Sequence, residues 1–239
     1  MQYPKQLNAF AVAKVLGPDP ITVEVAIVKK RLRRHLLERG PFSYDFFRRN
    51  SFALISHQKR LATLIEECSK TGQPLGRTSN IDVMQHALAQ YAGRAYQTFP
   101  VRPAIKEVKD GLIIRAHCTL YIVEQNQFSF EVYQPSRSID YSAEQIEFTS
   151  SLFVEALVRD DYAKGRVCYW DFCWNEGKTA RRADSYLFDS ANRISKKEID
   201  RVLTIYGAAY DELIAEGLPP EVWRPGHSFE DRQYDFWRG

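Results

Sequence analysis

Two neighbouring segments in the middle of the chain alternate between apolar and polar residues. In residues 111–123 the apolar residues occupy the even positions from Leu112 to Ile122, and the opposite face is shared by Arg115, His117, Thr119 and Tyr121. Residues 127–134 repeat the period of two, with a polar side made of Ser129, Glu131 and Tyr133. Such a period is typical of strands that bury one face, so both segments are predicted to be strands.

A three-residue connection over 124–126 would join these strands as an antiparallel hairpin whose apolar faces match. Leu120 would then lie opposite Phe130, and the polar pairs would be Thr119 with Glu131 and His117 with Tyr133. Residues directly opposite each other are in cross-strand contact, so the polar side chains of both strands are predicted to meet on one face.

The first hundred residues are predicted to be mainly helical after a short extended start. Apolar residues recur at helical spacing over 25–37, 44–69 and 81–97. Glycine and proline near 40–41 and 72–76 separate these three helices.

Capping signals predict two helices later in the chain. Ser142 with Gln145, and Ser195 with Glu198, have the spacing of capping boxes, and the helices they begin are expected to end near 158 and 217. Between them, residues 166–174 and 185–188 are predicted to be strands joined by a turn.

This order of elements favours a mixed α/β fold, with a central mixed sheet of about four to five strands flanked by helices. A chain of 239 residues with 44% hydrophobic residues can bury a sizeable core. We expect two regions, a mostly helical and basic N-terminal region over 1–78 and an α/β domain with a C-terminal tail over 79–239.

Composition predicts where the protein is located, but it does not indicate what the protein binds. The formal net charge is only +3, so the overall charge does not indicate a polyanion partner. Apolar runs long enough for a membrane span are absent, and the N-terminus MQYPKQLNAF lacks the features of a signal peptide. We therefore expect a cytoplasmic protein with no membrane contact. The four cysteines form no CxxC pair and are predicted to be buried free thiols rather than zinc ligands.

Positive charge is concentrated between residues 29 and 49. Eight Lys or Arg residues stand there against Glu38 and Asp45, with interleaved aromatics at Phe42, Tyr44, Phe46 and Phe47. Such a surface can neutralise phosphates and stack bases. The candidate phosphate contacts are Lys29, Lys30, Arg31, Arg33, Arg34, Arg48 and Arg49. A solvated amphipathic helix followed by core aromatics explains the pattern equally well. Arg181 and Arg182 add positive charge near a predicted strand end.

From about residue 79 the chain resembles the PD-(D/E)XK nuclease superfamily, its RecB-like branch in particular. His86 matches a histidine of the leading helix, Glu131 matches the acid of the acid-x-Lys pair, and Gln145 matches a glutamine of the following helix. The resemblance implies a nuclease whose acids hold one or two divalent metal ions at the scissile phosphodiester.

The chain departs from the family pattern at two positions. His117 or Thr119 stands where the family has an aspartate, and Tyr133 stands at the lysine position. One carboxylate holds Mg²⁺ poorly, although Glu131 with His117 would suit a softer ion such as Mn²⁺ or Zn²⁺. The tail that follows the last helix has no cysteine, so we expect no iron–sulfur cluster. No cofactor is expected unless the chain is an active nuclease, which would use Mg²⁺ or Mn²⁺.

Three hypotheses remain open from the sequence. The leading one is a nucleic-acid-associated protein with a degenerate nuclease-like domain, acting as a non-catalytic or weakly active subunit. The second is an active metal-dependent DNA or RNA nuclease that uses Glu131, His117 and Gln145, with His86 nearby. The third is a scaffold subunit that docks a protein partner through its aromatic tail, which contains Trp223, Phe229, Tyr234, Phe236 and Trp237. The same residues also have structural explanations: a polar hairpin face for His117, Glu131 and Tyr133, a solvated His86, and a cap for Gln145.

Overall fold

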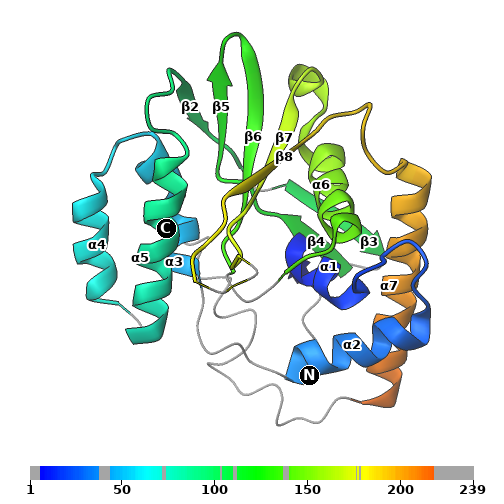
Figure 1. Ribbon diagram of the computed structural model, residues 1–239. Helices are drawn as coiled ribbons and strands as arrows, with labels where there is room; N and C mark the ends of the chain where they lie inside the picture. Colours follow the sequence, from blue (N-terminus) through cyan, green and yellow to red (C-terminus); the bar gives the residue numbers. More distant parts are fainter. Residues whose placement is uncertain are drawn as a thin grey trace.

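The computed structural model describes residues 6–37, 44–71, 74–102, 104–109, 112–136, 140–175, 177 and 179–217. It confirms a mixed α/β fold with two mixed sheets (Figure 1). The aromatic tail over 218–239, with the partner surface predicted for it, lies outside the described residues, and so does Phe42.

The larger sheet has five strands in the order β2–β5–β6–β7–β8. These strands are β2 (Gln97–Pro100), β5 (Leu120–Glu124), β6 (Gln127–Gln134), β7 (Arg166–Asp171) and β8 (Asp184–Phe188). All neighbours are antiparallel except β6 and β7, which are parallel because the helix α6 (Ala143–Leu157) connects them. The smaller sheet has the order β1–β4–β3, formed by β1 (Gln6–Asn8), β4 (Leu112–Ala116) and β3 (Ala104–Lys109).

Helices cover the strands from two sides (Figure 1). On one side lie α3 (Asp45–Ile55), α4 (Leu61–Ser69) and α5 (Pro74–Ala89), and on the other lie α1 (Ala9–Leu16), α2 (Val25–Leu37), α6 and α7 (Lys196–Glu216). Each side has its own hydrophobic core. Residues before and after position 78 contribute to both cores, so the basic N-terminal region packs together with the α/β part.

The predicted helix starts at 142 and 195 are confirmed. Ser142 accepts a hydrogen bond from the Gln145 N–H at 3.1 Å, and the Gln145 side-chain oxygen accepts from the Ser142 N–H at the same distance. Ser195 accepts from the Glu198 N–H at 3.2 Å. These caps satisfy backbone donors that the first helical turn leaves open.

Two helical predictions need correction. The helix expected over 44–69 is two helices, α3 and α4, separated by a turn at 56–60. The helix expected over 81–97 begins earlier, at Pro74, and ends at Ala89, so Gln97–Pro100 forms the edge strand β2. The sequence patterns also do not predict the strand β3.

The predicted hairpin forms, but its register is shifted by one residue. Gln125 and Asn126 both have positive φ, 51° and 60°, so the connection has two residues instead of three. Leu120 therefore lies opposite Glu131, and Ser129 opposite Ile122. The predicted contact of Thr119 with Glu131 across the hairpin is wrong, because Thr119 precedes the first paired residue of β5.

The single strand predicted over 111–123 is also wrong. It is divided into β4 and β5, which belong to different sheets, and residues 117–119 leave both ladders. The alternation of buried residues continues through the break, yet the buried side chains change sides: Ala116 and Cys118 pack in the first core, and Leu120 and Ile122 in the second. The break opens a seam between the sheets, where the candidate site lies.

None of the helices in the described ranges combines the length and the apolar character that crossing a bilayer requires.

Candidate functional site

A cavity of about 60 Å³ lies at the seam between the two sheets, with room for several water molecules. Arg115, His117 and Thr119 line it from the end of β4 and the break that follows, as the predicted polar face of that segment indicates. The helix α3 contributes Asp45, Phe47, Arg48 and Ser51 to the lining. Glu131 and Tyr133 of β6 and the beginning of α1 complete it. The structure thus brings together Glu131, His117 and Arg48 of the predicted site residues.

Glu131 is almost fully buried, with 2% of its surface exposed, and both carboxylate oxygens accept hydrogen bonds. Ser129 donates to Oε1 at 2.6 Å, while Tyr91 and the Trp170 indole donate to Oε2 at 2.7 and 2.5 Å. Burial raises the pKa of this carboxyl above its ordinary value, although the three hydrogen bonds act in the opposite direction. No local pattern identifies Tyr91 as a donor, because it lies beyond the end of α5, far from β6 in the chain.

Tyr133, at the position where the family has lysine, joins the same network. Its hydroxyl lies 2.8 Å from that of Tyr91, which donates to Glu131. Because Tyr91 uses its single hydroxyl proton on Glu131, Tyr133 donates to the Tyr91 oxygen. The two hydroxyl groups thus form a chain of hydrogen bonds that ends at the carboxylate. Burial raises the pKa of Tyr133 well above its ordinary value, so the phenol stays neutral. It cannot supply the positive charge that a lysine would bring to this position.

His117 shares the cavity with two cations. Burial lowers its pKa to about 4, and the charges of Arg48 and Arg115 act in the same direction. The imidazole is therefore neutral at physiological pH. Arg48 has a carboxylate neighbour, since its guanidinium lies 3.7 Å from Asp45 at the start of α3.

The structure does not bring His86 and Gln145 to this cavity. His86 lies on α5, where its ring contacts the Asp82 backbone oxygen at 2.9 Å and the Asp82 carboxylate at 3.3 Å, with about a third of the side chain exposed. Gln145 is buried at the start of α6, and its amide group donates to the Ala13 backbone oxygen at 2.8 Å while its oxygen completes the capping box. Both side chains have the structural roles considered from the sequence.

The predicted basic surface is divided among several environments. Lys29 pairs with Glu212 and Glu216 of α7 at 2.7 and 2.8 Å, and Arg33 also pairs with Glu216. Arg31 donates to the Leu16 backbone oxygen, close to Gly17.

Four cations of the basic surface, Lys30, Arg33, Arg34 and Arg49, are exposed, and Arg33 is the one paired with Glu216. Of the aromatics proposed for stacking, Tyr44 and Phe47 are buried in the second core, which supports the structural explanation for them. Base stacking by these two rings is excluded by their burial.

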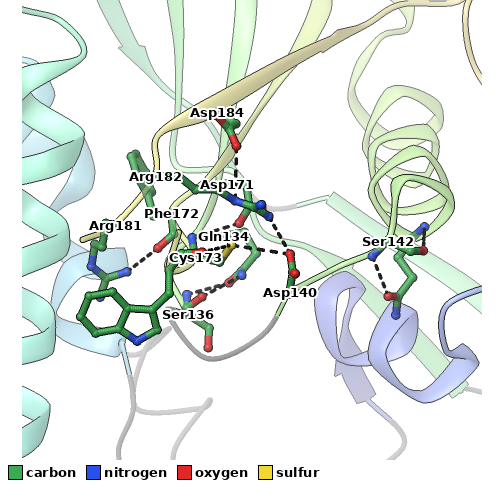
Figure 2. A network of polar contacts seen from close by, with 12 residues as sticks. Gln134, Ser136, Asp140, Ser142, Asp171, Phe172, Cys173, Arg181, Arg182 and Asp184 are labelled. Carbon is green, nitrogen blue, oxygen red and sulfur yellow. Dashed lines mark hydrogen bonds and ion pairs between the residues drawn. The ribbon is translucent and has the colours of Figure 1, made fainter. Parts of the chain in front are cut away.

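Arg181 and Arg182 lie inside polar networks instead of on a basic surface (Figure 2). Arg182 bridges the carboxylates of Asp140 and Asp171 at 2.7 and 2.6 Å and lies 3.3 Å from Asp184. Together with Cys173, Asp140 and Asp171 form a group whose ligand atoms lie within 4.8 Å of one another. Because the Arg182 guanidinium is paired with both carboxylates, the group is explained as an ion-pair network that holds the β7–β8 connection.

The cysteines are free and buried, as predicted. Cys118 donates to the backbone oxygens of Leu120 and Glu131 at 3.1 and 3.4 Å, so it belongs to the break between β4 and β5.

No protein-family profile and no curated protein sequence matches the chain. Among solved structures, it is similar to the one titled "Crystal structure of SSO0001", with 14% identity and a TM-score of 0.34 over 85% of this chain and 92% of that chain. A similarity of this size supports no conclusion about fold or function.

Proposed function

We propose that this protein is a nucleic-acid-associated subunit whose nuclease-like α/β domain does not catalyse. The observation that carries the proposal is the state of Glu131, whose oxygens accept hydrogen bonds from Ser129, Tyr91 and Trp170. A magnesium ion requires such oxygens as ligands, and it would have to displace these donors inside the protein.

The cations of the cavity support the same proposal. A nuclease of the resembled family needs negative ligands to hold its metal, whereas Arg48 and Arg115 line this cavity beside the neutral His117. Within the described part of the chain, Glu131 and His117 are not members of a group of three ligands close enough to share an ion, in contrast to Asp140, Asp171 and Cys173.

Nucleic-acid binding is proposed from the positive charge of α2 and α3. Lys30 and Arg34 are exposed and lie four residues apart, so they share one side of α2. Arg49 is exposed on α3. Cations on a surface of this kind neutralise phosphates and release counterions from the nucleic acid, which gives affinity that depends on salt.

The test is a mobility-shift titration of labelled single- and double-stranded DNA and RNA at several salt concentrations. The double variant Lys30→Glu/Arg34→Glu should weaken binding and reduce the slope of log affinity against log salt by about 2, one for each lost phosphate contact. These two positions are preferred to Arg31 and Arg33, whose contacts with Leu16 and Glu216 stabilise the fold.

The matched control is Lys196→Glu/Lys197→Glu, the same charge change at exposed positions near the start of α7. Because α2 pairs with Glu212 and Glu216 near the end of α7, the control lies roughly 20 Å away along the helix. Binding that weakens equally in both variants would contradict a role for α2.

Incubation of the same strands with Mg²⁺ or Mn²⁺ tests the non-catalytic part. The strands should remain intact. Metal-dependent cutting that disappears in Glu131→Gln would overturn it and favour the active nuclease, whereas the absence of binding to every strand, with concentration-dependent oligomerisation, would favour the scaffold hypothesis.

A further inference from the structure

Two guanidinium groups from different elements reach the same cavity. Arg48 comes from α3 and Arg115 from the end of β4. The two hydroxyl groups of the lining are bonded within the protein, since Ser51 donates to the Arg48 backbone oxygen at 3.1 Å and lies 2.7 Å from the Thr119 hydroxyl. The cavity is therefore lined by two planar cationic donor groups from different elements.

Two carboxylates, Asp45 and Glu131, also line the cavity. Asp45 lies 3.7 Å from the Arg48 guanidinium, longer than a direct hydrogen bond, and the Glu131 oxygens accept from Ser129, Tyr91 and Trp170. The neutral imidazole of His117 lies in the field of both arginines. The two guanidinium groups disfavour a divalent cation at this place and can donate hydrogen bonds to an anion.

We propose that the cavity binds a phosphate monoester, the terminal phosphate of a nucleic-acid strand, through Arg48 and Arg115. This inference rests on the proposed function and names its ligand. A terminal phosphate carries close to two negative charges and three free oxygens, which suit two guanidinium forks. An internal phosphodiester has one charge and two free oxygens, and its two ester links would have to leave the cavity on both sides.

The experiment compares one labelled strand with a 5′-phosphate, a 3′-phosphate or hydroxyl groups at both ends, at constant ionic strength. A phosphorylated strand should bind about tenfold to a hundredfold more tightly than the hydroxyl strand, the range expected for charge-assisted hydrogen bonds. Arg115→Met should remove this preference, because it keeps an unbranched apolar stem and removes the charged guanidinium group.

Arg49→Met is the matched control. It makes the same change on α3 next to Arg48, at an exposed position outside the cavity lining. It should lower the affinity for all strands in parallel and leave the preference for a phosphorylated end unchanged. A preference that falls equally in both variants would overturn the assignment to the cavity.

Ligand-dependent thermal unfolding provides a second measurement that requires no strand. Inorganic phosphate and a nucleoside monophosphate should raise the Tm of the wild-type protein above that in chloride of equal ionic strength, and should not raise that of Arg115→Met. If Arg115→Met does not fold, Arg48→Met replaces it in both measurements, with the same expected loss.

The outcomes separate this inference from the proposed function. Equal affinity for phosphorylated and hydroxyl strands, unchanged in Arg115→Met, would overturn the monoester site and leave nucleic-acid binding intact. An Arg115-dependent rise in Tm with the monophosphate, without binding of any strand, would overturn the strand end as the source and assign the site to a free nucleotide. Tight Mn²⁺ binding that depends on Glu131 would overturn both.

Discussion

Glu131 connects three segments that are far apart in the sequence. Its carboxylate accepts hydrogen bonds from Ser129 on its own strand, from Tyr91 after α5, and from Trp170 on the neighbouring β7. A buried acceptor with three satisfied donors is costly to remove, because each donor would lose its partner without gaining water. At the scale of the single residue, this carboxylate holds the second core to the sheet.

Glu131→Ala should therefore lower the free energy of unfolding by about 2–4 kcal/mol, because three buried donors lose their acceptor. Glu131→Gln should cost less than about 1 kcal/mol, since the amide oxygen can accept from Tyr91 and Trp170 while the amide nitrogen donates to Ser129. Urea denaturation followed by circular dichroism measures both. Equal losses in the two variants would contradict the role of this network.

The raised pKa of Glu131 predicts how the difference in stability between the wild type and Glu131→Gln changes with pH. The folded-state pKa of Glu131 is raised above its ordinary value of 4.5, so between the two pKa values the native state binds more protons than the unfolded state. The contribution of Glu131 to stability is then fully present below pH 4.5 and decreases as the pH rises through the folded pKa. The stability of Glu131→Gln relative to wild type should accordingly increase from acidic to neutral pH, and a decrease would contradict the raised pKa.

At the scale of elements, sequence patterns predict the features that depend only on residues close together in the chain. The serines at 142 and 195 cap their helices because the cap needs only residues three positions apart. The β6 strand follows from its alternation of side chains. The division between β4 and β5 does not, because the period of two continues unchanged through Cys118 while the chain moves from one sheet to the other. Which core receives a buried side chain depends on packing partners that are distant in the sequence.

The hairpin register could not be predicted for a related reason. A two-residue and a three-residue connection are both compatible with the polar residues 124–127, and the choice shifts every pair by one position. The structure uses two residues with positive φ, which glycine and asparagine adopt more readily than glutamine.

A change in the turn tests this register. Gln125→Asn with Asn126→Gly creates the dipeptide that best suits two successive positive φ angles, and should raise the free energy of unfolding by about 0.5–1 kcal/mol. Gln125→Val should lower it by about 1–2 kcal/mol, because a β-branched side chain is strained at φ of 51°. Thermal and urea unfolding measure both. A gain in the valine variant would indicate a three-residue connection instead.

The candidate site shows the same limit of prediction. Arg115, His117 and Thr119 were expected on one face, and they line the cavity together. Their partners Arg48 and Ser51 come from a helix that precedes them by more than sixty positions, which no local pattern relates to them. Glu131 and His117, the metal ligands suggested by the sequence, therefore line a cavity that also holds Arg48 and Arg115. Arg48 reaches it because the fold packs α3 against the break between β4 and β5.

At the scale of the whole molecule, Arg181 connects the α3–α5 layer to the large sheet. Its buried guanidinium pairs with Asp82 of α5 and donates to the backbone oxygens of Pro135 and Phe172 at 2.8 and 2.7 Å. It also lies 5.6 Å from the ring centre of Tyr44, just before α3. One side chain thus contacts segments of both layers, so the positive charge expected near a strand end is buried at Arg181.

Arg181→Met should lower the free energy of unfolding by about 3–5 kcal/mol, the usual cost of removing one partner from a buried ion pair with further hydrogen bonds. The backbone oxygens of Pro135 and Phe172 would lose their donor in a place closed to water. The control is Lys59→Met, which removes a positive charge from the partly exposed pair with Glu67 and should cost less than about 1 kcal/mol. Both cores contain residues of β6 and β7, and Arg181 contacts the residues that directly follow these two strands. Far-UV circular dichroism and tryptophan fluorescence should therefore report one common, lowered midpoint. Two separate midpoints would mean that the α3–α5 layer unfolds on its own and that Arg181 stabilises that layer alone.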